Sequence, residues 1–81
     1  MQKNEIYTKL NNVFREVFDD EGIVVTAETT SSDIEAWDSL EHINLIVAVE
    51  QEFKIKFNMK EVTTMNNVGD MVNIILSKIN N

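Results

Sequence analysis

Apolar residues recur at helical spacing in three stretches of the chain, with polar residues between them. This periodicity predicts three amphipathic helices, over residues 4–19, 39–53 and 68–79. The apolar positions are Ile6, Leu10, Val13, Phe14, Val17 and Phe18 in the first stretch, Leu45, Ile46, Val49 and Phe53 in the second, and Val68, Met71, Val72, Ile75, Leu76 and Ile79 in the third. Each helix has an apolar face to bury, which favours helices packed around a shared core.

Residues that prefer helix ends mark the boundaries of these helices. Gly22 is expected to cap the C-terminus of the first helix, because glycine adopts the left-handed conformation easily. Asp38 is a favourable N-cap for the second helix, and Glu41, three residues later, completes a capping-box pattern. Asn66 or Asn67 is expected to cap the start of the last helix.

The segments between the helices predict a long first connection and one more, short helix. Residues 23–26 are β-branched or apolar but have no partner strand, so they are expected to form an extended loop with apolar side chains in the core. The loop continues to about Ala36, with a helical turn at 33–36. A short helix is expected over 59–63. The predicted fold is all-α: a small four-helix bundle with three main helices, a short third helix, and a long loop between helices one and two.

The helix predicted over residues 39–53 has two apolar arcs instead of one. At about 100° per residue, Leu40, Ile43 and Val47 lie on a second arc, well away from the core-facing positions. One helix of a small bundle rarely buries two faces, so these side chains are expected to form a partly exposed patch of the kind that docks a partner. The alternative is that a neighbouring helix or the long loop covers them.

Composition and charge narrow the classes of function. A chain of 81 residues can form one domain with a modest core, and we expect residues 1–81 to be a single domain. Fourteen acidic and seven basic residues give a net charge of −7, which disfavours nucleic acid and anionic membranes and favours a partner with a basic surface. Because there is no cysteine, the chain has no disulfide, no thiolate metal site and no nucleophilic thiol.

The chain shows no signal for export or for a membrane. Its first residues lack the apolar stretch of a signal peptide, and no window approaches the roughly 18 apolar residues of a membrane span. Because the chain begins at Met1 and ends in the polar pair Asn80-Asn81, we expect a stand-alone cytoplasmic protein. The acidic run at 19–21 lacks the alternating ligands of a calcium loop, so no metal site is predicted.

Ser39 is the strongest candidate for chemistry. It stands at the predicted start of a helix, in the sequence Asp38-Ser39-Leu40, where backbone N–H groups and the helix dipole favour an attached phosphate. His42, the single histidine, is expected to be half-buried at the same end, with Trp37 packed against the helix start. Ser39 and His42 have no glycine-framed elbow and no oxyanion partner, so no catalytic residue is assigned.

The chain resembles the acyl carrier proteins over nearly its whole length. The residues that carry the resemblance are Asp38-Ser39-Leu40, then Ile43 and Leu45, and the run Ala48-Val49-Glu50-Gln51-Glu52-Phe53. The resemblance implies a four-helix bundle that catalyses no reaction itself. It also implies that a phosphopantetheinyl transferase moves 4′-phosphopantetheine from coenzyme A onto Ser39. The thiol of this arm would then hold acyl groups as thioesters.

The resemblance also implies roles for the positions around the serine. Asp38 and Leu40 flank the attachment site and help the transferase to recognise it. The positions that match partner-docking residues of such proteins are Glu41, Ile43, Val47 and Glu50. The implied partners are acyl-loading and acyl-processing enzymes with basic docking surfaces, and the chain is expected to be a monomer.

Some positions depart from the pattern of general fatty-acid carriers. Asn44 and Gln51 stand where those proteins usually have acidic residues. Lys54, Lys56 and Lys60 put positive charge where those proteins are commonly acidic. These departures indicate a specialised carrier, for a polyketide, a modified lipid, a surface polysaccharide or an aminoacyl intermediate.

The same residues are also compatible with a second class of function. An unmodified acidic adaptor would keep the fold and bind a protein through the patch of Leu40, Ile43 and Val47. The two hypotheses differ in whether Ser39 carries an arm, and therefore in whether Ser39→Ala abolishes function.

Overall fold

The computed structural model describes residues 1–79 and is all-α in this range. Asn80 and Asn81, the predicted polar chain end, lie outside the described residues. The elements are α1 (Lys3–Val17), a 3₁₀ turn (Ser31–Asp33), α2 (Ser39–Phe53), α3 (Met59–Thr64) and α4 (Val68–Ile79). The predicted all-α fold is confirmed, and each predicted helix boundary lies within two residues of the observed one.

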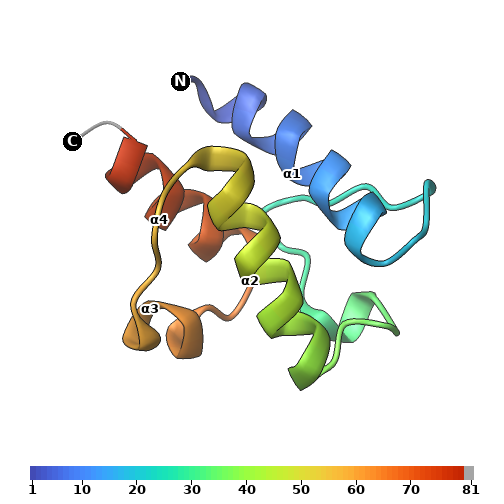
Figure 1. The fold of residues 1–81 in the computed structure, drawn as a ribbon. Helices are drawn as coiled ribbons and strands as arrows, with labels where there is room; N and C mark the ends of the chain where they lie inside the picture. Colours follow the sequence, from blue (N-terminus) through green and yellow to red (C-terminus); the bar gives the residue numbers. More distant parts are fainter. Residues whose placement is uncertain (80–81) are drawn as a thin grey trace.

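The three long helices surround one core. α1 packs against both α2 and α4, and the short α3 lies beyond them, in the connection from α2 to α4 (Figure 1). Most predicted core-facing positions are buried; those that are only half-buried, at the edge of the core, are Val17, Phe18, Leu76 and Ile79. No helix within residues 1–79 has both the length and the apolar character needed to cross a membrane.

The long loop between α1 and α2 contributes to the core, as predicted, but through alternate residues. Ile23 and Val25 are buried, whereas Val24 points outward and is 68% exposed. Backbone groups of the loop are held by polar side chains of α1. The amide of Val25 donates to Asn11 Oδ1 at 2.7 Å, and Arg15 Nε donates to the carbonyl oxygen of Ile23 at 2.7 Å. Side chains of α1 thus take the place of the missing partner strand.

The middle of the same loop holds the start of α4. The amide of Val68 donates to the carbonyl oxygen of Thr29, and the amide of Gly69 to that of Ala27, both at 2.9 Å. These two amides belong to the first turn of a helix, where no intrahelical acceptor exists. Asn67 caps the same end, because its Oδ1 accepts from the amide of residue 70 at 2.8 Å. The loop and the Asn67 side chain together provide hydrogen-bond acceptors for the backbone amides at the start of α4.

The C-terminus of α1 differs from the prediction. Asp19 adopts the left-handed conformation with φ 50°, and the amide of Asp20 returns to the carbonyl oxygen of Arg15 at 3.0 Å. Gly22 does not have a positive φ, so its predicted role as the cap is wrong. Aspartate tolerates the left-handed region better than most residues, which lets α1 end at Val17 with its left-handed residue, Asp19, three residues before the glycine.

The helical turn within the loop is also shifted from its predicted place at 33–36. The structure has a 3₁₀ turn at Ser31–Asp33, and the predicted stretch holds only a single hydrogen-bonded turn, in which the amide of Trp37 donates to the carbonyl oxygen of Ile34 at 3.0 Å. Thr30 sets its start, because its hydroxyl accepts from the amide of Ser32 at 3.3 Å, and its own amide donates to Asp33 Oδ2 at 2.9 Å. The hydrogen bonds that Thr30 forms with Ser32 and with Asp33 therefore decide where the turn forms.

Candidate functional site

The start of α2 is fixed by its N-cap. Asp38 Oδ1 accepts a hydrogen bond from the amide of Glu41 at 2.8 Å, as predicted. The predicted return bond from the Glu41 carboxylate to the Asp38 amide is absent among the described residues, where Glu41 Oε1 accepts from Asn44 Nδ2 at 2.8 Å instead. The Asp38 amide donates to the carbonyl oxygen of Ala36 at 3.1 Å. Only half of the capping box forms, because Asn44 in the next turn takes up the carboxylate.

Ser39 is the first residue of α2 and is exposed. The amides of Ser39 and Leu40 lie in the first turn, where helix geometry provides no intrahelical acceptor. These amides and the helix dipole favour a negatively charged group on the Ser39 hydroxyl. The structure therefore offers a hydroxyl that an enzyme can reach and a setting that suits a phosphodiester.

A hollow of about 560 Å³ opens beside Ser39, between the start of α2, α3 and the loop before α4. Its apolar lining comes from Trp37, Ile43, Met59, Val62 and Met65, and polar groups of Ser31, Asn66 and Asn67 lie among them. The hollow therefore combines an apolar wall with polar groups next to the candidate hydroxyl. The sequence did not reveal it, because its walls come from segments far apart in the chain.

His42 links the start of α2 to the segment before it and to α3. Its Nδ1 accepts a hydrogen bond from Trp37 Nε1–H at 3.0 Å, and its Nε2 lies 3.3 Å from the carbonyl oxygen of Val62 in α3. The first bond requires an unprotonated Nδ1, so the proton of the neutral ring is on Nε2, which donates to Val62. Both ring nitrogens are thus engaged, and the predicted half-buried position of His42 is confirmed.

Trp37 is buried against the start of α2, as predicted. Its ring meets Phe14 edge-on, with centroids 5.2 Å apart, and stacks on His42 at 5.9 Å. The residue two positions before Ser39 is therefore anchored on α1 and α2 at once. The segment that leads into the candidate site is held in place by packing.

α3 is joined to α4 by an ion pair at the back of the site. Glu61 Oε1 lies 3.0 Å from Lys78 Nζ and accepts from the amide of Asn58 at 2.9 Å. The Asn58 amide first, and Lys78 second, lower the pKa of Glu61 from its ordinary value of 4.5. The carboxylate therefore stays ionised in mildly acidic solution and keeps the start of α3 in place.

The predicted apolar patch on α2 is exposed. Leu40, Ile43 and Val47 are 73%, 53% and 47% exposed, so neither a neighbouring helix nor the loop covers them. Glu41 is half-buried at the edge of this patch. Glu50 is also half-buried, and its Oε2 accepts a hydrogen bond from the amide of Phe57 at 2.8 Å. The structure thus gives Glu50 a contact within the chain that the sequence pattern did not indicate.

Asp38→Ala should lower the free energy of unfolding by about 1 kcal/mol, because the amide of Glu41 loses its acceptor. Asp38→Asn is the matched control, since its amide oxygen occupies the same position, and it should cost less. Urea denaturation followed by far-ultraviolet circular dichroism measures both. Equal losses in the two variants would show that the cap bond does not stabilise α2.

Comparison with protein families matches this chain to a known attachment domain. Residues 8–75 fit the profile of the family described as "Phosphopantetheine attachment site". An acyl carrier protein from Cyanidium caldarium is 33% identical over 81 residues, which cover 98% of this chain and 92% of that protein. One from a Picosynechococcus strain is 35% identical and covers 91% of each chain.

A solved structure matches the fold as well. The solution structure of a holo acyl carrier protein from Geobacter metallireducens superposes with a TM-score of 0.86 and is 47% identical in sequence. The match covers 91% of this chain and 85% of the other. The similarity in sequence and in fold extends over α1 to α4 and includes the start of α2.

Proposed function

We propose a function for this chain from one premise: it belongs to the acyl carrier protein family, whose domain carries a phosphopantetheine attachment site. In our proposal 4′-phosphopantetheine is attached to the Ser39 hydroxyl, and residues 1–81 act as one carrier domain. The arm supplies a terminal thiol that holds acyl groups as thioesters. The chain itself presents the arm and is read by the enzymes that load and process the acyl group.

The observation that supports Ser39 most directly is its place at the start of α2. The hydroxyl is exposed, and Asp38 fixes the helix end that presents it. In the transfer, the Ser39 oxygen bonds to the phosphorus that bears the pantetheine, and the phosphoanhydride bond of coenzyme A breaks. The serine proton is lost and 3′,5′-adenosine bisphosphate leaves. The product is a phosphodiester at a helix N-terminus, where its charge is stabilised.

The carrier role also agrees with the state of His42. A serine hydrolase needs a histidine nitrogen that accepts the proton of its serine. In this structure Trp37 occupies Nδ1, and Nε2 faces the Val62 carbonyl oxygen. His42 therefore acts as a structural tie between the segment before α2 and α3, and we assign no catalytic residue.

We further propose that partners dock on the exposed side of α2. Ile43 and Val47 provide apolar contact, and Glu41 adds negative charge that attracts a basic surface. Glu50 contributes charge to the same side, although its carboxylate also accepts from Phe57. These partners are a phosphopantetheinyl transferase and enzymes of a fatty-acid-like, polyketide or other specialised synthesis, which we expect in the cytoplasm, and the carrier itself is a monomer.

Incubation with coenzyme A and a broad-specificity phosphopantetheinyl transferase should add the mass of one phosphopantetheine to the protein. Ser39→Ala should gain no mass, whereas the matched control Ser31→Ala should gain the same mass as the original. Intact-protein mass spectrometry measures all three. Modification of Ser39→Ala would refute Ser39 as the site.

The second candidate, an unmodified adaptor, is supported by the exposure of Leu40, Ile43 and Val47. It predicts no mass gain with any of several such transferases and no arm on protein isolated from its native host. In that case Ser39→Ala would leave function intact. The same mass measurement therefore separates the two candidates.

A further inference from the structure

The charge on the exposed side of α2 changes from negative to positive along the helix. At the N-terminal end, Asp38 and Glu41 carry negative charge beside exposed Leu40. At the C-terminal end, Lys54 and Lys56 are exposed, and among residues 1–79 neither forms an ion pair. At 1.5 Å per residue, the two charged ends are about 20 Å apart along the helix. Ile43 and Val47 form the apolar strip between them.

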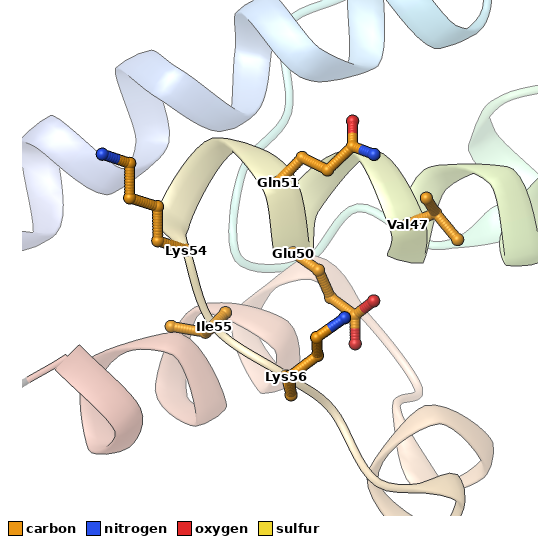
Figure 2. A pocket seen from close by; sticks show the side chains of 6 residues that line it. All are labelled: Val47, Glu50, Gln51, Lys54, Ile55 and Lys56. Atoms are coloured by element: carbon orange, nitrogen blue, oxygen red, sulfur yellow. The ribbon is translucent and has the colours of Figure 1, made fainter.

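A hollow of about 410 Å³ lies at the positive end of this side. It is lined by Val47, Glu50, Gln51, Lys54, Ile55 and Lys56. In Figure 2 the Lys56 side chain extends along the hollow toward Glu50, and Lys54 extends away from it. Lys54 and Lys56, set against the one carboxylate of Glu50, give this end of α2 one net positive charge, in a chain whose net charge is −7.

The chain holds this positive end in a defined shape. Lys54 adopts the left-handed conformation with φ 57°, and the amide of Ile55 returns to the carbonyl oxygen of Glu50 at 3.1 Å. The Glu50 carboxylate then accepts from the amide of Phe57 at 2.8 Å. Glu50 therefore binds both ends of the turn that presents Lys56. Lys54 is the C-cap of α2, and Lys56 lies in the connection after it, which these hydrogen bonds hold against the helix end.

We propose that this side of α2 docks partner proteins of mixed charge: cations opposite Asp38 and Glu41, and a carboxylate in the hollow beside Lys56. The inference rests on the proposed function and specifies the partner surface that this carrier fits. A partner with a uniformly basic surface meets repulsion at Lys54 and Lys56. The positive end thus selects among enzymes that the acidic end alone would attract equally.

The test uses two helical peptides of about 18 residues, roughly 27 Å long, with the same stripe of leucines. One is bipolar, with lysines in its first half and glutamates in its second, and the other has lysines throughout. Each is titrated into the ¹⁵N-labelled holo protein, and amide shifts report the affinity and the location of binding. The variant is Lys56→Glu, and the matched control is Lys3→Glu, an exposed lysine at the start of α1 with the same change of charge.

The bipolar peptide should shift amides along α2, and Lys56→Glu should weaken its binding roughly three- to tenfold. The same variant should strengthen binding of the all-lysine peptide, whereas Lys3→Glu should have the smaller effect on both. The proposal is wrong if the bipolar peptide does not bind α2, or if Lys56→Glu and Lys3→Glu act alike. Self-association of the chain that Lys56→Glu abolishes, measured by sedimentation velocity, would assign the face to a second copy and also overturn it.

Failure of this inference is distinguishable from failure of the proposed function. Peptide binding is measured again on the unmodified Ser39→Ala protein, where the preference for the bipolar peptide should persist because Ser39 does not line the hollow beside Lys56. A protein that gains phosphopantetheine but does not distinguish the peptides keeps its carrier role and loses the bipolar partner. A protein that distinguishes the peptides but gains no phosphopantetheine keeps the bipolar partner and loses the carrier role.

Discussion

Trp37→Ala should lower the free energy of unfolding by about 3–5 kcal/mol, which is a large part of the stability of a domain of this size. Trp37 is buried, with only 8% of the residue exposed. Its loss leaves a cavity against Phe14 and removes the donor to His42. Urea denaturation followed by circular dichroism measures the change, because the variant has no tryptophan left to follow by fluorescence.

Trp37→Phe separates packing from hydrogen bonding. It keeps an aromatic ring against Phe14 and deletes the N–H that His42 Nδ1 accepts. The expected cost beyond the lost volume is about 1 kcal/mol. If Trp37→Ala proved no more costly than Trp37→Phe, packing against α1 would not be the main contribution of this residue.

Gly69→Ala should destabilise the protein by roughly 1–3 kcal/mol, although alanine alone favours a helix by about 1 kcal/mol over glycine. A Cβ at this position would lie 2.9 Å from the Ala27 carbonyl oxygen and 3.2 Å from Ala27 Cβ. The oxygen cannot simply move away, because it accepts the amide of Gly69 itself at 2.9 Å. The substitution therefore forces the loop off the start of α4.

Asn73→Ala is the matched control for this second prediction. Asn73 is exposed on the same helix, so alanine there tests helix propensity without a steric cost. It should leave the free energy of unfolding unchanged or raise it slightly. A stabilising Gly69→Ala, measured by the same denaturation, would show that the loop and α4 are not in tight contact.

Periodicity predicted the helices well because their packing follows from local pattern. The ranges 39–53 and 68–79 agree with α2 and α4, since Asp38 and Asn67 are strong caps that act within four residues. The end of α1 could not be predicted in the same way. Glycine is the usual left-handed residue, but here Asp19 takes that conformation, with Gly22 left outside the cap.

The candidate site was partly visible in the sequence. The place of Ser39 at a helix start and the exposure of Ile43 and Val47 follow from helix geometry, which the sequence encodes. The contacts of His42 do not, because Trp37 and Val62 reach it from a loop and from another helix. Hydrogen bonds between separate elements depend on how those elements pack, and no spacing in one stretch reveals them.

The attachment of the long loop to both α1 and α4 has a consequence for how the chain folds. α4 completes its first turn with the carbonyl oxygens of Ala27 and Thr29, which belong to the other half of the sequence. A large loop must therefore close before this helix has a stable start, and its closure entropy opposes the step. The other backbone hydrogen bonds outside the helices of residues 1–79 join residues close together in the sequence. These two hydrogen bonds between the loop and α4 should therefore help the helices to form and melt cooperatively, as a single unit.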